Sequence, residues 1–125
     1  MESFEELEVW KVGRELRQAI SKLVKEFPLE EKFKLKDQII RSSRSVTANI
    51  SEGFGRFHFQ ENIQYCRQAR GSLSETLDHL ICALDEGYIS QDVFDHHKSL
   101  VKRCWKLLNG YIAYLKKASS NPITQ

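Results

Sequence analysis

Apolar residues recur every three or four positions along four stretches of this chain, and this spacing limits the fold more than any other feature. The strict apolar–polar alternation of a half-buried strand does not occur in the sequence. Only two prolines and six glycines are found among 125 residues, so little interrupts the helical pattern. The spacing therefore predicts an all-α chain with four helices.

The four apolar stripes indicate how the helices pack. Each stretch supplies one stripe, represented in chain order by Leu16, Ile39, Leu73 and Leu108. The connections are short, which favours antiparallel neighbours and hence an up-down-up-down four-helix bundle. We expect residues 1–118 to form this bundle as a single domain, and residues 119–125 to form a flexible tail.

Signals for helix ends accompany the stripes. Ser3 and Glu6 have capping-box spacing, which predicts that the first helix begins there. Gly53 and Gly55 flank Phe54, an arrangement typical of the C-terminal end of a helix. The second helix is therefore expected to stop at this Gly-Phe-Gly sequence.

Two neighbouring residues of the third stretch break its apolar pattern. Arg70 falls inside the stripe, where its guanidinium needs a carboxylate partner or a route to water along its stem. Gly71 lowers helix propensity, which favours a close approach of another backbone at that point.

A second face of the second stretch carries small, amide and charged side chains. At 100° per residue they fall within an arc of about 80°, centred roughly 120° from the apolar stripe. Such a face fits a subunit interface, an ordinary solvated surface, or a ligand or nucleic-acid contact, and we predict the interface. Trp10 is either a bundle-edge residue or an interface anchor. The candidate interface residues are Trp10 and a motif face formed by Arg41, Ser45, Asn49, Glu52 and Arg56.

Four segments together resemble a known family. Residues 45–56 are similar to a pattern that reads roughly Ser-Ile-Pro-x-Asn-Ile-Ala-Glu-Gly-x-Gly-Arg, and residues 4–10, 68–75 and 84–89 agree in order and spacing. The pattern is that of the ribosomal-RNA intervening-sequence proteins, small bacterial four-helix bundles. The resemblance implies assembly into a homopentameric ring. Related accessory proteins of diversity-generating retroelements use basic bundle rings to bind nucleic acid.

Residue patterns for catalysis are scarce. Di-iron bundles use a Glu-x-x-His motif on each of two helices, and the sequence has none. Glu75 with His79, and Asp92 with His96, are isolated pairs at helical spacing, too few for a metal site. No glycine-rich phosphate loop precedes a helix. We expect no enzyme activity, no cofactor and no metal.

The fourth stretch carries a row of basic residues. Its lysines occupy an arc of about 100° nearly opposite the apolar stripe, with one arginine just beside it. The row is either a solvated helix face or a phosphate-contacting surface. In a ring, several copies of a weak patch would add by multivalency. The candidate nucleic-acid-binding residues are Lys98, Lys102, Arg103, Lys106, Lys116 and Lys117.

The turn after the second stretch departs from the family pattern. Phe57, His58 and Phe59 stand where many members have a basic, serine-containing turn. The two phenylalanines either close the bundle end or a subunit seam, or stack on unpaired bases. The substitution removes positive charge from this loop.

The sequence as a whole predicts a non-catalytic, oligomeric protein that binds RNA or another nucleic acid, or else a protein-interaction scaffold without nucleic-acid binding. Its partners are other copies of itself, with RNA or a protein partner in addition. Three cysteines, an odd number without close pairing, indicate buried free thiols in a reducing compartment. No signal peptide or membrane-spanning run is evident, so we expect a cytoplasmic protein.

Overall fold

A computed structural model describes residues 1–120 of the chain. Its long elements are four α-helices: α1 (Glu8–Leu23), α2 (Leu35–Phe54), α3 (Phe59–Asp85) and α4 (Gln91–Ser119). Short 3-10 helices occupy Phe4–Glu6 (η1), Val24–Glu26 (η2) and Leu29–Glu31 (η3). The described residues contain no strand, which confirms the all-α prediction.

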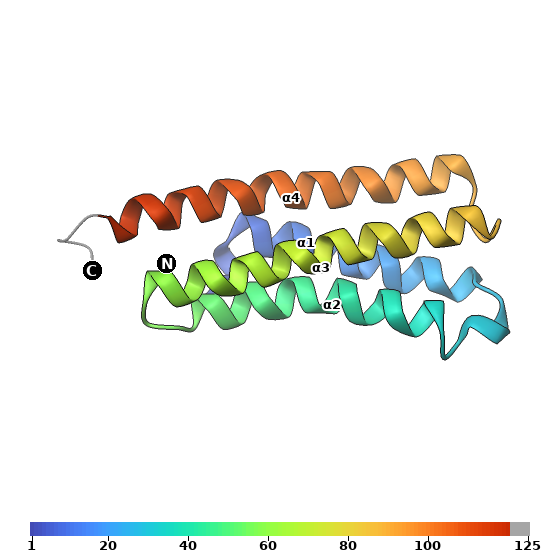
Figure 1. Cartoon of the computed structure of the whole chain (residues 1–125), viewed down its shortest axis with the longest axis horizontal. Helices are drawn as coiled ribbons and strands as arrows, with labels where there is room; N and C mark the ends of the chain where they lie inside the picture. The colour runs from blue at the N-terminus through green and yellow to red at the C-terminus, as the bar shows by residue number, and fades with distance from the viewer. Residues whose placement is uncertain (121–125) are drawn as a thin grey trace.

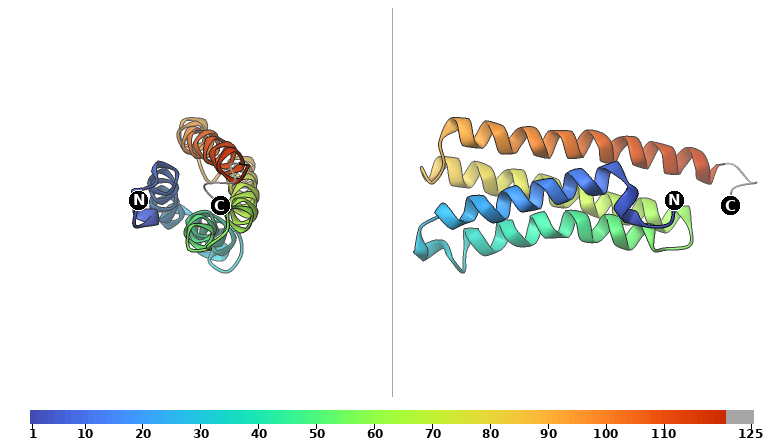
Figure 2. Two further views of the ribbon diagram at one scale, coloured as in Figure 1. Left: turned by 90° about the vertical axis from the view of Figure 1, so that its left-hand side faces the viewer. Right: turned by 180° about the vertical axis from the view of Figure 1, so that it is seen from behind.

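The helices lie side by side along the long axis of the molecule (Figure 1). Consecutive helices contact each other, and α1 also contacts α4, so the four helices enclose one core (Figure 2). Leu16, Ile39, Leu73 and Leu108 are fully buried there, as the apolar spacing predicted. Two buried residues outside the predicted stripes, Ile89 and Phe94, close the core where α3 joins α4.

The first helix is shorter than the capping-box spacing predicted. Ser3 Oγ accepts a hydrogen bond from the Glu5 backbone N–H at 3.2 Å, so Ser3 caps η1 and not α1. The Glu6 carboxylate accepts from the Glu2 N–H instead of the Ser3 N–H that a capping box requires. Leu7 is extended and buried, and α1 begins only after it. Burial of the Leu7 side chain therefore stabilises the chain more than a helix that continued through Leu7 would.

Helix lengths differ in a way that shapes one end of the bundle. At 1.5 Å per residue, the 16 residues of α1 span about 24 Å, whereas the 29 residues of α4 span about 43 Å. The right-hand view of Figure 2 shows α1 starting well short of the end where α4 finishes. Residues 1–7 cover that end in place of a fourth helix. Helix α4 continues to Ser119, one residue past the predicted domain boundary, and residues 121–125 of the predicted tail lie outside the described residues.

The cysteines divide into two environments. Cys66 and Cys104 are buried, and burial raises the pKa of each thiol to about 12. Cys82 is exposed, contrary to the prediction that all three thiols are buried. It lies sixteen residues after Cys66 on α3, about 160° around the helix and hence on the solvent side. Burial, followed by the charges of Asp78, Asp85 and Glu86, raises the pKa of the Cys82 thiol.

Arg70 and Gly71 take positions that differ from the predicted ones. Arg70 is half-buried at the edge of α3, and its Nη1 donates to Asn109 Oδ1 on α4 at 2.9 Å, whereas the sequence predicted a carboxylate partner or a route to water. A Cβ added at Gly71 meets nothing within 4 Å, so the prediction of a close backbone approach is wrong within the chain. Gly110 on α4 is equally open.

The two open glycines supply a sensitive test of the surface around them. Gly71→Ala and Gly110→Ala each gain helix propensity without a clash, so we expect the free energy of unfolding to rise by about 0.5–1 kcal/mol. Urea denaturation at fixed protein concentration measures the change. A loss of stability together with a smaller particle mass contradicts this expectation and places a second copy against that glycine.

Candidate nucleic-acid interface

The predicted lysines lie on one face of α4 in two groups, Lys98 to Lys106 and Lys116 with Lys117, about 15 Å apart along the helix. We call Lys98, Lys102, Lys106, Lys116 and Lys117 the basic stripe; all but Lys98 are exposed. The Lys98 ammonium lies 5.8 Å from the centre of the Phe94 ring. In the described residues 1–120 the other four lysines form no ion pair, whereas Arg103 donates to Glu15 Oε2 on α1 at 3.1 Å. The stripe therefore keeps its positive charge available to an external anion.

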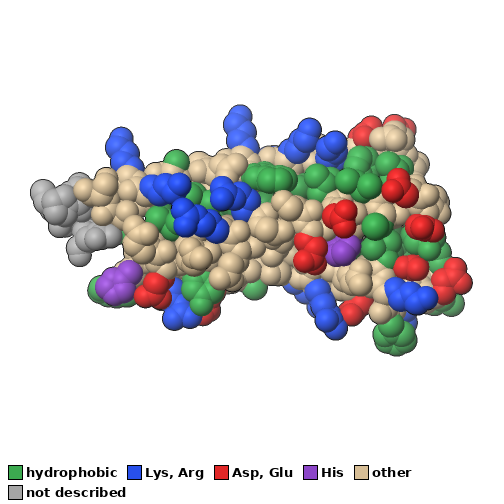
Figure 3. All heavy atoms as spheres, viewed as in Figure 1, with side chains coloured by type: hydrophobic (Ala, Val, Ile, Leu, Met, Phe, Trp, Pro, Cys, Tyr) green, Lys and Arg blue, Asp and Glu red, His purple; other side chains and the backbone are tan. Residues whose placement is uncertain are grey.

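Helix α3 extends this basic surface. Arg67 is exposed, and Arg70 reaches α4 through its bond to Asn109. Figure 3 shows Lys and Arg side chains gathered along α4 and the neighbouring part of α3, while acidic side chains gather at the end where α3 joins α4. Sequence reasoning missed both arginines because it assigned Arg70 to the core stripe. The polar Asn109, which faces the same seam from α4, is the signal that could have placed it.

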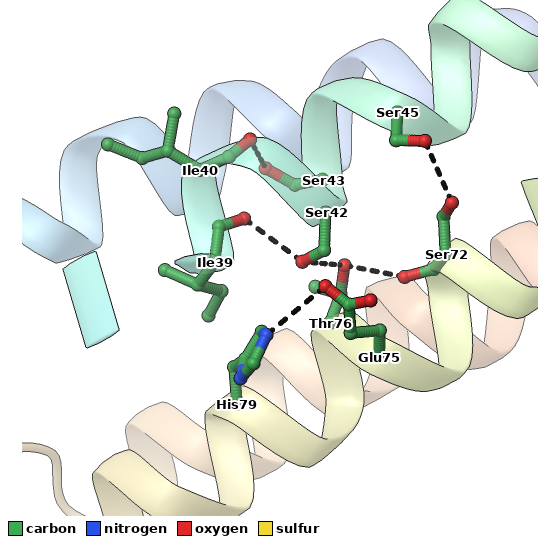
Figure 4. Close-up of polar contacts among 9 residues, drawn as sticks. All are labelled: Ile39, Ile40, Ser42, Ser43, Ser45, Ser72, Glu75, Thr76 and His79. Carbon is green, nitrogen blue, oxygen red and sulfur yellow. Dashed lines mark hydrogen bonds and ion pairs between the residues drawn. The ribbon is translucent and has the colours of Figure 1, made fainter. Parts of the chain in front are cut away.

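The motif face is engaged partly by α3 of the same chain. Asn49 Nδ2 donates to the Ser45 carbonyl at 2.9 Å and to Ser45 Oγ at 3.0 Å. Ser72 Oγ on α3 donates to Ser45 Oγ at 2.9 Å, one turn from the buried Ser42–Thr76 pair, whose oxygens lie 2.8 Å apart (Figure 4). The small residues of α2 thus give a close, hydroxyl-linked seam with α3. Asn49 Oδ1 accepts no hydrogen bond from residues 1–120.

The charged end of the motif face also contacts α3. Arg56 Nη2 donates to the Tyr65 hydroxyl at 2.7 Å and to Glu52 Oε1 at 2.9 Å. The hydrogen bond that Arg56 donates to the Tyr65 hydroxyl is the main cause that raises the pKa of its guanidinium. Arg56 Nη1 also lies 3.8 Å from the Glu61 carboxylate. The arginine is thereby oriented on the surface by three neighbours.

The remaining candidate interface residues are exposed or at an edge. Arg41 is exposed and pairs with Asp37 one turn earlier, at 3.0 Å. Trp10, on α1, is half-buried and packs edge-on against Phe4 with 5.2 Å between ring centroids. Arg14 lies over the other part of that ring, 5.8 Å from its centre. The structure thus brings together Ser45, Asn49, Glu52 and Arg56 along the α2–α3 seam, and it places Trp10 on a different helix.

Gly53 has a role that its sequence context did not reveal. Helix α2 ends at Phe54, within the predicted Gly-Phe-Gly sequence, and Gly53 is the last residue but one inside the helix. A Cβ at this position would stand 2.7 Å from Asn62 Oδ1 and 2.9 Å from Tyr65 Cβ. Because α3 passes so close, only glycine fits. Gly55 is the C-cap, with ordinary right-handed backbone angles.

The Phe57–Phe59 turn divides its aromatic side chains between the core and the solvent. Phe59 packs against the core, whereas Phe57 is 96% exposed. Beside the turn, the end that α1 does not reach holds a cavity of about 430 Å³, which we call the aromatic pocket. Its lining includes the rings of Phe54, Phe57, Phe59, Tyr111 and Tyr114. Tyr111 and Tyr114 are nearly parallel, with 12° between their planes.

Other polar groups supply no second site. Glu75 and His79 lie 3.3 Å apart on α3 (Figure 4), and no group of three potential metal ligands occurs among residues 1–120. A second hollow of about 490 Å³ lies between α1 and α4, where His97 Nδ1 bonds to the Val93 carbonyl at 2.7 Å. In the part of the chain that the structure describes, no helix has the length and apolar character needed to cross a membrane.

Comparison with known proteins agrees with this architecture. The chain resembles the crystal structure of a protein with unknown function from the S23 ribosomal protein family of Bacteroides thetaiotaomicron. The two are 27% identical, the match covers 83% of this chain and 97% of that one, and the TM-score is 0.77. No curated protein matches the sequence. A family model described as 23S rRNA-intervening sequence protein matches residues 5–110. The chain therefore belongs to the 23S rRNA-intervening sequence protein family.

Proposed function

We propose that this chain is a non-catalytic, oligomeric bundle protein that binds RNA through the basic stripe of α4. The observation that carries the proposal is the row of exposed lysines, Lys102, Lys106, Lys116 and Lys117, none of which pairs with a carboxylate of residues 1–120. Lysines that point into solvent along one helix face can each contact a phosphate and release its counterions. Unpaired thiols at Cys66 and Cys104 support a cytoplasmic site of action.

The proposed assembly is a homopentameric ring of up-down-up-down bundles. Support comes from the free acceptor of Asn49 and from the exposed Arg41, which lie outside the protomer core. Each protomer adds one basic stripe, and five weak stripes on one particle bind a long polyanion far more tightly than a single stripe. Weak individual contacts are thereby sufficient for the proposed function.

The first experiment measures RNA binding as a function of salt. If four lysines of one stripe each contact a phosphate, the log–log slope of affinity against salt is about −2.8 to −3.6, and affinity falls about 50- to 150-fold between 50 and 200 mM salt. Electrophoretic mobility shifts with a structured RNA give the slope. We expect little sequence preference, because phosphate contacts carry no base information. An affinity that is independent of salt contradicts the proposal.

The second experiment measures particle mass. Light scattering coupled to size exclusion should give a mass near five times the 14.6 kDa of one chain. Glu52→Lys places like charges beside Arg56 on the motif face, so we expect partial dissociation of the ring. Glu86→Lys supplies the matched control, since it reverses an exposed charge at the end of α3, outside the motif face. A single-chain mass at micromolar concentration rejects the ring.

A protein-interaction scaffold is the second candidate function, and one observation favours it. Leu29 and Phe33, in the connection between α1 and α2, are 90% and 84% exposed. Apolar side chains this exposed are typical of protein-binding surfaces. If the protein shows no affinity for RNA at low salt, the scaffold function replaces RNA binding.

A further inference from the structure

The aromatic pocket has features that the packing of this chain does not require. Phe57 is 96% exposed and Tyr114 is 63% exposed, so their rings present flat apolar surface to solvent. The cavity volume of about 430 Å³ lies within the usual range for small-ligand sites. Five aromatic rings line it, and aromatic rings favour a flat partner over an aliphatic one.

We propose that the aromatic pocket binds one unpaired base of a single-stranded RNA, whose backbone continues along the C-terminal lysines of α4. This inference rests on the proposed function and extends it to a second type of contact. The base stacks against the exposed aromatic rings, as bases do on aromatic platforms in other single-strand-binding proteins. Its phosphates face Lys117, which is the lysine nearest to Tyr114 on the surface of α4.

The position of the lysines joins the pocket to the basic stripe. Lys117 follows Tyr114 by three residues on α4, so the two side chains are neighbours on the helix surface. Lys116 and Lys117 form no ion pair within residues 1–120. An RNA strand that leaves the pocket therefore meets unpaired positive charge within one helical turn. This charge favours a polyanion over a neutral or cationic aromatic ligand.

Among the polar groups that line the pocket, the Tyr111 hydroxyl can donate a hydrogen bond to the edge of a base. The Tyr111 hydroxyl accepts a hydrogen bond from Asn62 Nδ2 at 3.1 Å, and its own O–H has no acceptor among residues 1–120. Burial is the main cause that raises the pKa of Tyr111, which keeps this hydroxyl protonated at neutral pH. A single O–H donor fits a carbonyl oxygen or ring nitrogen, and all four RNA bases carry such acceptors. We therefore expect stacking to dominate over base selection.

The two phenylalanines of the turn occupy different positions at the pocket. Phe59 packs against the core and fixes the turn, whereas Phe57 extends into solvent at the pocket rim. The hydrogen bond from Gln60 Nε2 to Ser119 Oγ, 3.3 Å long, ties the start of α3 to the end of α4 beside this rim. Phe59 and this hydrogen bond join the rim to the core and to the end of α4.

The test compares two ligands of equal charge. One is a single-stranded RNA pentanucleotide, and the other is a ribose-phosphate chain of the same length without bases. We expect the base-free chain to bind about fivefold to 150-fold more weakly at low salt, with the same salt slope. Phe57→Ala and Tyr114→Ala should each reduce this difference. Phe33→Ala, which removes an 84% exposed ring in the α1–α2 connection, should leave it unchanged.

Each outcome separates the pocket from the basic stripe. Equal affinity for both ligands, with a steep salt slope, overturns the base site and leaves RNA binding by α4 intact. No binding of either ligand at low salt rejects the site and the proposed function together. If Phe33→Ala alone changes the affinity difference, the exposed apolar connection of a second copy occupies the pocket, and the base site is overturned.

Discussion

Replacing Gly53 by alanine is expected to lower the free energy of unfolding by about 2–3 kcal/mol, near the upper end of the usual cost of overpacking a core. The added Cβ would stand 2.7 Å from Asn62 Oδ1 and 3.1 Å from the Asn62 backbone oxygen. Neither neighbour can move freely, because the Asn62 side chain is bonded to Tyr111 and its backbone belongs to α3. Urea denaturation at one fixed protein concentration gives the value.

Gly55→Ala is the matched control for this substitution. A Cβ at Gly55 meets its nearest atoms at 3.5 and 3.6 Å, which is ordinary van der Waals contact, and its backbone angles suit alanine. We expect no loss of stability there, and a small gain from the reduced entropy of the unfolded chain. If the two variants lose equal stability, the close approach of α3 to Gly53 is not the reason for the glycine.

Exchanging Lys102 and Lys106 for glutamate is expected to weaken RNA binding by about tenfold to a hundredfold at moderate salt, through the loss of two phosphate contacts and added repulsion. The salt slope should also become shallower by about 1.5. The loss should be similar for every sequence tested, because these lysines contact no base. Both side chains are exposed and unpaired, so the fold should be unaffected. Mobility shifts over a salt series measure both quantities.

Lys32→Glu with Lys34→Glu separates the local effect from that of overall charge. The pair lies in the connection between α1 and α2, is exposed, and changes the net charge of the chain by the same amount. We expect its RNA affinity to fall far less than that of the α4 variant. Equal losses would mean that the protein responds to total charge, and the basic stripe would no longer be the binding surface.

The helices and most core positions could be predicted from the sequence because helical periodicity is a local property. The break between η1 and α1 at Leu7 could not be predicted from the sequence, because it depends on the burial of Leu7 against other elements. The glycines show the same limit: Gly53 is packed against α3 and Gly71 is open, although both sit in helices. The distance between two packed helices decides which glycine contacts a neighbour, and this distance cannot be predicted from helical periodicity.

The candidate site, like the fold, could be predicted from the sequence only in part. The lysines of α4 follow one another along a single helix, so their common face could be read directly from their spacing. Arg67 and Arg70 join that surface only because α3 packs beside α4. For the Phe57–Phe59 turn, the sequence left both roles open, and the structure assigns one phenylalanine to the core and the other to the surface.

The short α1 implies that the free energy of local unfolding differs between the two ends of the bundle. At the end where α2 and α4 finish and α3 begins, there is no helical fourth neighbour. Fewer apolar contacts hold the backbone there, and residues 1–7 supply only the single turn of η1. Segments with few buried contacts open at lower free energy than the rest of a protein. Amide hydrogens at this end should therefore exchange through local opening, while those midway along α3 and α4 should exchange only when the whole domain unfolds. The aromatic pocket lies in the part of the molecule that opens first.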